Sequence, residues 1–461
     1  MLKQTIFREY DIRGLADAEL SNEGVRLLGK ALGAYLDRAG VRSVTLGHDA
    51  RLSGPRLRDA LRDGLLSTGC DTVDLGMVPT PVLYHAVTRS GEGAAGVMIT
   101  GSHNPAEYNG FKTMLGAGTL HGEAIQDLYR LHSGHAFPAG AGRASTANAI
   151  PAYVDEVARQ FRFNRRVKVV FDAGNGAAGP TLSRLLERLN VEAIPLFFEP
   201  DGRFPNHHPD PTVEENLDAL KTKVLETGAD LGIAFDGDVD RIGAVDEKGR
   251  VIWGDMLMLI FGREILTRKP GATFIGEVKC SQVMYDELKR LGGNPIMYKT
   301  GHSLIKAKMK ETHAELAGEM SGHMFFADRY LGYDDALYSA CRLIEIVAAS
   351  GRPLSAQTEG LPAMLCTPEL RIDCPDERKF DVVSRTKLHF EQRYETIGID
   401  GVRVLFPHGW GLVRASNTQP VLVLRFEAAT PELLDEYRRE VETVVLEKLS
   451  PSAAGGGDAL R

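Results

Sequence analysis

The segment LGIAFDGDVDR, residues 231–241, joins an apolar run to an acidic loop. Two other segments share this pattern: AAGVMIT, residues 94–100, leads into GSHNP, and AELAG, residues 314–318, leads into EMSGH. Buried parallel strands read as continuous apolar runs, and ligands bind beyond their carboxyl ends. We therefore predict three related α/β domains, each with one functional loop at the end of a buried strand.

A β-rich run also lies upstream of each apolar run and begins the corresponding predicted domain segment. The runs are VRSVTLGHDAR (41–51), RVKVVFDAGNG (166–176) and GATFIGEVKCS (271–281), and a helical pattern follows each one. After the second run, leucines recur at i, i+3, i+4 and i+7 behind Pro180; they are Leu182, Leu185, Leu186 and Leu189. This spacing predicts an amphipathic helix with the proline in its first turn.

The last hundred residues have a different pattern. Short β-like runs are broken by Asp-Gly and His-Gly pairs, a helical stretch covers residues 376 to about 392, and a final helix begins at Pro431. These features predict an antiparallel α+β domain. The predicted domains are residues 1–147, 148–251, 252–365 and 366–450, followed by a Gly- and Ala-rich tail, 451–461, that we expect to be disordered.

Composition narrows the class of protein. The chain has 461 residues, 43% of them hydrophobic and 25% charged, which excludes wholesale disorder. Its net charge of −8 has the wrong sign for a protein that coats nucleic acid. The first 14 residues lack the apolar core of a signal peptide, and no run is long enough to span a membrane. Together with five scattered cysteines, this predicts a cytoplasmic protein with reduced thiols.

The acidic loop contains Asp236, Asp238 and Asp240, which a curled chain can turn toward one point. Like charges this close are costly without a cation, and oxygen-only ligands favour a hard metal such as magnesium. A calcium EF-hand loop is disfavoured because Arg241 stands at its sixth position, where that loop needs Gly. A solvated acidic turn is the alternative.

The loop TGSHNP, residues 100–105, places Ser102 beside the small Gly101 in a turn that Pro105 stiffens. We expect the Ser102 hydroxyl to be accessible, as a nucleophile requires. The alternative is a polar turn in which Ser102 caps the next segment. The loop is not the G-x-S-x-G elbow of hydrolases, because Asn104 stands where the second glycine should be.

A glycine-rich stretch, GNGAAG over residues 174–179, matches the G-x-G-x-x-G fingerprint of dinucleotide-binding folds, with Glu199 farther along the chain. An NAD-dependent oxidoreductase is the alternative that this motif leaves open. We prefer the interpretation that small residues let this helix pack closely on its strand, since nothing else in the chain resembles a hydride-transfer site.

Two further loops carry groups suited to a sugar phosphate. GEMSGH (318–323) offers a carboxylate, a hydroxyl and an imidazole that could grip sugar hydroxyls, and RASNT (414–418) has the cation, hydroxyls and amide of a phosphate clamp. Each could also be an ordinary polar turn or hairpin. Four basic residues beside turns are individually typical of surface charges: Arg13, Lys112, Lys279 and His302.

Taken together, these loops resemble those of the α-D-phosphohexomutase superfamily, most closely its bacterial phosphomannomutase/phosphoglucomutase branch. The resemblance covers nearly the whole chain. Its motifs are YDIRG (10–14), TGSHNP (100–105), NGFK (109–112), DGDVDR (236–241), TGHS (300–303), GEMSGH (318–323) and RASNTQP (414–420). It implies four domains around a central cleft: three related α/β domains with mixed sheets and a C-terminal antiparallel α+β domain.

The resemblance also implies an activity, which is reversible phosphoryl transfer between the 1- and 6-positions of glucose or mannose phosphates. Ser102 would carry the phosphoryl group, and glucose 1,6-bisphosphate would be both activator and intermediate. A phosphoserine oxygen would bind magnesium together with Asp236, Asp238 and Asp240. Beside Ser102, the implied catalytic residues are Arg13, Lys112, Arg241 and His302, and the general acid/base stays open among Lys112, His302 and Arg13.

Substrate contacts are implied in the same way. The residues concerned are Tyr10, Lys279, His302, Glu319, Ser321, His323, Arg414, Ser416, Asn417 and Thr418. Glu319 and Ser321 would hold the sugar hydroxyls, and residues 414–418 would bind the phosphate that is not reacting. Because the bisphosphate must turn around between two transfers, we expect the C-terminal domain to be a mobile lid.

Other functions remain as alternatives. The phosphoglucosamine mutase branch typically has Gln where this chain has Met320, which favours glucose and mannose phosphates. An NAD-dependent oxidoreductase and a non-catalytic sugar-phosphate-binding protein are the alternatives from other classes. We expect a monomer or weak homodimer that acts on small hexose phosphates and has neither nucleic-acid nor membrane partners.

Overall fold

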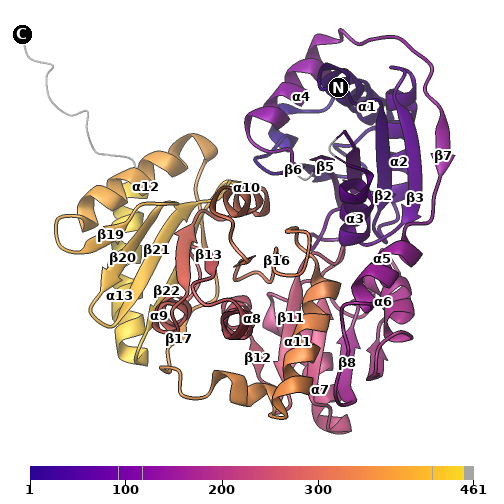
Figure 1. The fold of residues 1–461 in the computed structure, drawn as a ribbon. Coiled ribbons are helices and arrows are strands. Elements are labelled where there is room, and N and C mark those ends of the chain that lie inside the picture. The colour runs from indigo at the N-terminus through magenta and orange to yellow at the C-terminus, as the bar shows by residue number, and fades with distance from the viewer. Residues whose placement is uncertain (92, 117, 418, 451–461) are drawn as a thin grey trace, which may run out of the picture. The chain divides into compact units, whose positions relative to one another are not determined.

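The computed structural model describes residues 1–450 except 92, 117 and 418 (Figure 1). The predicted disordered tail therefore lies outside the described residues. Two compact units are present. Residues 1–276, 286–296 and 301–359 form the first unit, and residues 277–285, 297–300 and the chain from 360 onward form the second unit.

The first sheet has the strand order β1-β5-β4-β2-β3-β7, with β6 paired to β5. Its strands are β1 (Ile12–Leu15), β2 (Ser43–His48), β3 (Asp71–Met77), β4 (Ala95–Ile99), β5 (Tyr108–Leu115), β6 (Gly118–Thr119) and β7 (Ala144–Thr146). The helices of this region are η1 (Gln4–Ile6), α1 (Asn22–Arg38), α2 (Gly54–Leu66), α3 (Thr80–Ser90) and α4 (Glu123–Gly134). Leucines of α1 and α2 form one apolar core with β2 and β4.

The second and third sheets have the strand orders β12-β11-β10-β8-β9 and β14-β13-β15-β16. The second region contains α5 (Ile150–Ala158), β8 (Val167–Asp172), α6 (Ala178–Leu186), β9 (Val191–Leu196), η2 (Glu214–Leu217), α7 (Asp218–Thr227), β10 (Leu231–Phe235), β11 (Ile242–Asp246) and β12 (Val251–Ile252). The third contains α8 (Gly254–Arg268), β13 (Thr273–Glu277), α9 (Gln282–Arg290), β14 (Asn294–Tyr298), α10 (His302–Thr312), β15 (Leu316–Gly318), β16 (Met324–Phe326), α11 (Ala336–Ser350) and η3 (Leu354–Thr358).

One strand arrangement recurs in all three sheets. The strand that opens each segment pairs in parallel with the strand before the functional loop: β2 with β4, β8 with β10, and β13 with β15. The next strand then returns antiparallel: β5 on β4, β11 on β10, and β16 on β15. This confirms the predicted set of three related α/β domains with mixed sheets. It also puts each functional loop at the turn between a parallel strand and an antiparallel one.

Helix α6 is shorter than its leucine spacing predicted. Leu182 and Leu185 are buried as expected, but the helix ends at Leu186 and Leu189 lies beyond it. The Glu187 N–H donates to the carbonyls of both Ser183 and Leu185. Bonds of this kind tighten a last turn and end a helix.

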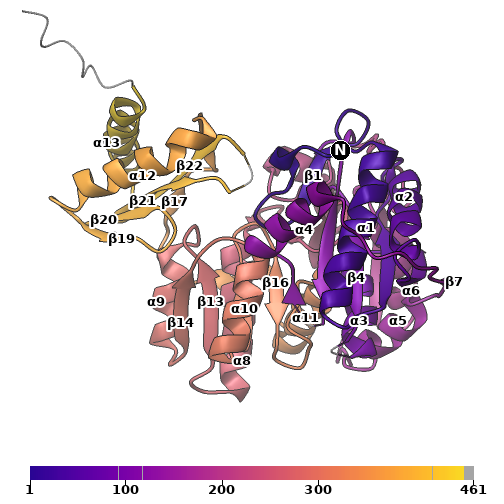
Figure 2. The same ribbon diagram turned by 90° about the horizontal axis from the view of Figure 1, so that it is seen from above.

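The second unit contains an antiparallel sheet with the order β17-β22-β21-β20-β19, and β18 also pairs with β22. The strands are β17 (Leu365–Cys366), β18 (Leu370–Asp373), β19 (Glu395–Ile397), β20 (Val402–Phe406), β21 (Gly409–Ala415) and β22 (Val421–Ala428). Helices α12 (Asp376–Phe390) and α13 (Pro431–Leu449) share one core with the sheet (Figure 2). The predicted α+β domain and both of its helices are confirmed.

Two general expectations can be compared with the structure. All five cysteines are free thiols, as their scattered positions predicted. Among the described residues, no helix combines the length and the apolar character needed to cross a membrane.

Candidate active site

Ser102 lies directly after β4 in a left-handed backbone conformation, with φ of 50°. Its side chain is only 2% exposed, so the expectation of an accessible hydroxyl is wrong. The loop turns the hydroxyl inward, where Oγ donates to Asp236 Oδ2 at 2.8 Å. Positive φ is uncommon outside glycine, and such strain gathers at functional sites.

Arg51 shapes the Ser102 loop, although no motif of the sequence contains it. Its buried guanidinium donates to four backbone carbonyls, those of Ser102, Asn104 and Pro105 in the loop and that of Tyr108 at the start of β5. Gly101 is needed beside it, because a Cβ at that position would lie 2.6 Å from Arg51 Cζ. An arginine after a strand carries no specific sequence signal. Only the fold shows that its two terminal nitrogens donate to these four carbonyls, while Nε donates to Asp49 Oδ2.

The acidic loop after β10 is buried, which rules out a solvated turn. Asp236, Asp238 and Asp240 are fully buried, and their candidate ligand atoms lie within 4.8 Å of one another. Lys112 of β5 donates to Asp238 Oδ2 at 2.7 Å and to Asp240 Oδ2 at 2.5 Å. Burial opposes the charge on Lys112, but the carboxylates outweigh it and raise its pKa well above the ordinary value. Burial and the charges of Asp240 and Asp238 raise the pKa of Asp236 well above its usual range.

This acidic cluster fits a divalent metal ion. One ammonium faces three carboxyl groups, and the Oδ1 atoms of Asp238 and Asp240 have no hydrogen-bond partner within the described part of the chain. A buried donor set made only of carboxylate oxygens suits a hard cation. The raised pKa of Asp236 points the same way, because a cation would favour its ionised form.

The basic residues that looked like surface charges are mostly buried. Lys112 is 3% exposed, Lys279 6% and His302 8%. Arg13 of β1 donates to Asn104 Oδ1 at 3.1 Å, so its guanidinium adjoins the Ser102 loop. Burial and the nearby Lys306 ammonium lower the pKa of His302 well below the ordinary value, which leaves a neutral imidazole at neutral pH.

The loop GEMSGH lies against both α10 and the acidic loop. Ser321 Oγ donates to Glu319 Oε2 at 3.1 Å, and the Gly301 N–H donates to Glu319 Oε1 at 2.9 Å. A Cβ at Gly301 would collide with the ring of Tyr10, and the His302 ring lies 6.0 Å from the Tyr10 ring between centroids. The first unit therefore brings together loops from all three α/β domains.

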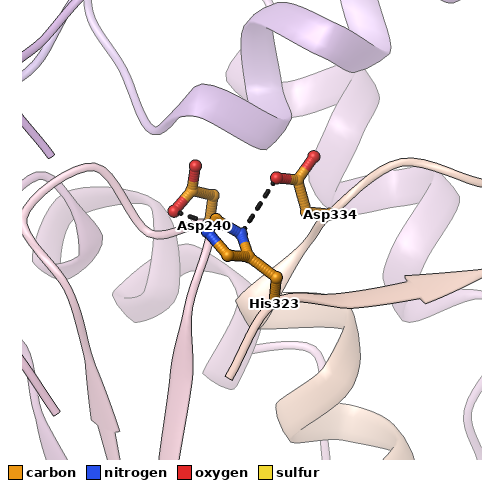
Figure 3. Close-up of side chains that lie close together, drawn as sticks. All are labelled: Asp240, His323 and Asp334. Atoms are coloured by element: carbon orange, nitrogen blue, oxygen red, sulfur yellow. Dashed lines mark ion pairs between the residues drawn. The ribbon is translucent and has the colours of Figure 1, made fainter. Parts of the chain in front are cut away.

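His323 joins this loop to the acidic cluster. Arg241 Nε donates to His323 Nε2 at 3.0 Å. The other ring nitrogen, Nδ1, lies 3.0 Å from Asp334 Oδ2 and 3.7 Å from Asp240 Oδ1 (Figure 3). Burial opposes ionisation of Asp334, but Lys306 and His323 outweigh it and hold the pKa of Asp334 well below its usual range. Neither Asp334 nor Lys306 was predicted from the sequence.

The sequence of the chain matches the models of one protein family along most of its length. Sequence models of the phosphoglucomutase/phosphomannomutase family match the chain in four successive parts. Alpha/beta/alpha domains I, II and III match residues 4–133, 151–249 and 253–364, and the C-terminal domain matches residues 369–444. The chain belongs to this family.

Individual relatives agree with the phosphoglucomutase/phosphomannomutase assignment. A phosphomannomutase/phosphoglucomutase of Pseudomonas putida is 45% identical over 446 residues, 96% of either chain. A phosphoglucomutase of Neisseria gonorrhoeae is 43% identical over 449 residues, which cover 96% of this chain and 97% of the relative. The crystal structure of a phosphoglucomutase/phosphomannomutase family protein from Burkholderia thailandensis superposes with a TM-score of 0.91 at 42% identity, covering 97% of this chain and 98% of that one.

Family membership agrees with the close-packing interpretation of GNGAAG in this phosphoglucomutase/phosphomannomutase fold. The Ala177 N–H donates to the Gly237 carbonyl at 3.0 Å, and a Cβ at Gly176 would lie 2.8 Å from the same oxygen. At Gly179 a Cβ would run into the carbonyl of Phe198. The small residues thus allow this segment to pack directly against the backbone of the acidic loop.

The second unit contains the remaining predicted residues of this family member. Arg414 lies at the end of β21, one step earlier than the turn in which it was predicted, and its Nε donates to Asp400 Oδ2 at 3.0 Å. Ser416 Oγ accepts from the Gln419 N–H at 3.1 Å, and Asn417 follows it. Thr418 lies outside the described residues.

Lys279 also belongs to the second unit. Its ammonium lies 2.6 Å from Glu369 Oε1. The charge of Lys279 lowers the pKa of Glu369 to about 2, so Glu369 is ionised at neutral pH.

Proposed function

We propose that this chain interconverts the 1- and 6-phosphates of glucose or mannose through phospho-Ser102 and a hexose 1,6-bisphosphate. The observation that carries the proposal is the 2.8 Å contact of Ser102 Oγ with Asp236, inside a buried cluster of three aspartates and one lysine. The names of the Pseudomonas putida and Neisseria gonorrhoeae relatives supply the sugar class.

The reaction consists of two transfers. First, a free sugar hydroxyl attacks the phosphorus of phospho-Ser102. The bond to the serine oxygen breaks, a bond to the sugar oxygen forms, and the hydroxyl proton is released while Ser102 Oγ gains one. The bisphosphate then turns around, and its other phosphoryl group returns to Ser102 by the reverse exchange. The isomeric monophosphate leaves and the enzyme is again phosphorylated.

Charge stabilisation and proton transfer divide among the basic residues of the site. Lys112 keeps its proton because of the neighbouring carboxylates, and Arg13 keeps a permanent charge, so both suit stabilisation of the transferring phosphoryl group. His302 is neutral, which suits acceptance of the hydroxyl proton. Arg241 adds a further cation beside the acidic loop.

The acidic cluster would hold magnesium, with Asp236, Asp238, Asp240 and a phosphoserine oxygen as ligands. When bound there, the ion offsets negative charge on the phosphoryl group. Glu319 and Ser321, already joined by a hydrogen bond, would contact the hydroxyls between the two phosphates, with Tyr10 and His323 beside them. Arg414, Ser416, Asn417 and Thr418 would bind the distal phosphate, and Lys279 would contact the substrate.

The decisive experiment locates the phosphoryl group. After incubation with glucose 1,6-bisphosphate, intact-mass and peptide mapping should find one phosphate, on Ser102. Ser102→Ala should neither accept it nor interconvert glucose 1-phosphate and glucose 6-phosphate. Ser339→Ala is the matched control, because Ser339 is equally buried but, within the described residues, its hydroxyl donates to the carbonyl of Asp335, the N-cap of α11. Turnover by Ser102→Ala at the wild-type rate would refute the mechanism.

Substrate preference needs a separate assay. Glucose 1-phosphate, mannose 1-phosphate and glucosamine 1-phosphate are compared side by side at saturating magnesium. We expect turnover of the first two to exceed that of the third. The opposite order would make the chain a phosphoglucosamine mutase.

A further inference from the structure

The imidazole of His323 is held in one orientation by a different group at each ring nitrogen. Nε2 accepts a hydrogen bond from Arg241 Nε at 3.0 Å. A neutral imidazole that accepts at Nε2 carries its hydrogen on Nδ1. That nitrogen faces Asp334 Oδ2 at 3.0 Å, the approach drawn in Figure 3. Asp334 and Arg241 therefore lie at opposite ends of one chain of contacts through His323.

Asp334 is itself held by a second buried group. Its Oδ1 accepts from Lys306 Nζ at 3.2 Å, and the ammonium lies 4.7 Å from the centre of the Tyr84 ring. Neither Asp334 Oδ2 nor His323 Nδ1 forms a hydrogen bond in the described ranges of the chain; the two atoms lie 3.0 Å apart, an ion-pair distance without hydrogen-bond geometry. Each of these two atoms is thus left with the other as its nearest partner of complementary chemistry.

We propose that Asp334 is a positioning residue: it keeps the hydrogen of His323 on Nδ1, so that Nε2 stays an acceptor and holds the Arg241 guanidinium beside the acidic loop. The role for Arg241 rests on the proposed phosphoryl transfer, in which this cation stabilises the reacting group. Carboxylates that orient a histidine through one ring nitrogen are a general device of enzymes and metal sites.

A metal ion is the competing explanation for the same side chains, since Asp240, His323 and Asp334 have candidate ligand atoms close together. Asp334 already faces Lys306 at 3.2 Å, and His323 has Arg241 as a donor on its far side. The charge of Asp334 is therefore matched within the protein, which favours a direct contact with His323 over a second ion.

The variant Asp334→Asn gives a specific expectation. The Lys306 ammonium can only donate, so it keeps the amide oxygen, and the amide NH2 turns toward His323 Nδ1. The imidazole must then accept at Nδ1 and carry its hydrogen on Nε2, where it opposes the Arg241 N–H. The substitution should reverse the tautomer of His323 and release Arg241.

The first readout is the tautomer itself. Long-range proton–nitrogen NMR spectra of protein labelled at its 13 histidines, with His323 identified by its loss in His323→Gln, should show hydrogen on Nδ1 in the wild type and on Nε2 in Asp334→Asn. Asp335→Asn is the matched control, because the neighbouring carboxylate bonds Tyr153 and Tyr330 instead. It should leave the His323 signals unchanged.

The second readout is kinetic, on enzyme first phosphorylated with glucose 1,6-bisphosphate. Asp334→Asn should lower kcat about 100-fold with little change in KM. In the proposal Arg241 contacts only the phosphoryl group that is transferred, so its displacement affects the transition state and not substrate binding. In the double variant Lys306→Met/Asp334→Asn the amide oxygen is free to face Nδ1 again. The wild-type tautomer should return, and kcat should recover by about tenfold or more over Asp334→Asn.

The outcomes separate the possibilities. Hydrogen on Nε2 in the wild type, or an unchanged tautomer and unchanged kcat in Asp334→Asn, would overturn the proposal without any bearing on Ser102. The single variant Lys306→Met is measured as well, and fold losses of kcat in the two single variants that simply multiply in the double variant would indicate a purely structural role. Saturable shifts of the wild-type His323 signals in a manganese titration that persist in Asp236→Asn would indicate a metal ion instead. Failure of Ser102 phosphorylation in the wild type would refute the proposed function but leave the tautomer result standing.

Discussion

Replacing Asp335 by Asn should remove a pH-dependent loss of stability from the first unit. Asp335 is the N-cap of α11, where its carboxylate accepts from the Tyr338 N–H at 2.9 Å. It also accepts from the hydroxyls of Tyr153, at 2.9 Å, and Tyr330, at 2.7 Å. Burial nevertheless dominates these bonds and raises the pKa of Asp335 to about 6.

The sign and size of the pH-dependent change in unfolding free energy follow from proton linkage. A carboxyl group whose pKa is higher in the folded than in the unfolded state favours folding when protonated, so this stability is present below about pH 4 and lost as pH rises through about 6. A shift from about 3.9 to about 6, at 1.36 kcal/mol per pKa unit, makes the total loss about 3 kcal/mol. Roughly 1.4 kcal/mol of it falls between pH 5 and pH 8.

The assay is denaturant unfolding at pH 5, 6, 7 and 8, followed by the near-ultraviolet signal of the tyrosines around α11. Relative to Asp335→Asn, the wild type should lose about 1.4 kcal/mol of unfolding free energy across this range. Asn keeps an oxygen for the Tyr338 N–H, so the cap survives. Asp63→Asn, at an exposed position of α2, controls for the loss of a carboxylate. A difference between wild type and Asp335→Asn that does not change with pH would refute the reasoning.

Two further predictions concern the candidate active site. Asp238→Asn should fold normally yet lose at least about 100-fold in kcat, because the metal is bound more weakly and the phosphoryl charge is poorly offset; unaltered turnover in that variant, or in metal-stripped wild type, would contradict the assignment. Arg414→Ala should still be phosphorylated on Ser102 but show a KM for glucose 1-phosphate raised about tenfold or more, since a charge-assisted hydrogen bond contributes about 1.5–3 kcal/mol. An unchanged KM would remove Arg414 from the phosphate site.

The sequence predicted the architecture well because the relevant signals are local in the chain. Apolar runs such as LGIAF at residues 231–235 became the buried strands before the functional loops. The Asp-Gly and His-Gly pairs became the turns of the antiparallel sheet. The error at Leu189 has a local cause as well, since an i+7 leucine cannot show that the preceding turn has already closed with Glu187.

The site was predicted less completely, because its members come from distant parts of the chain. Ser102 and the three aspartates were identified by residue type, but the burial of Ser102 was not. Arg51 and Asp334 were missed altogether. Their neighbours in sequence give no sign that one donates to four carbonyls between Ser102 and the start of β5 and that the other lies against His323.

By itself, the sequence determined which residues of this chain can do chemistry, and in what order they occur. Residue type and spacing set the oxygen donors, the hydroxyl and the cations, because these are covalent properties of the chain. The tertiary structure alone determined the ionisation state and the orientation of these side chains. Folding places Lys112 between two carboxylates and sets a different group against each nitrogen of His323. In a buried, low-dielectric environment those neighbours determine each group's charge and hydrogen-bonding role.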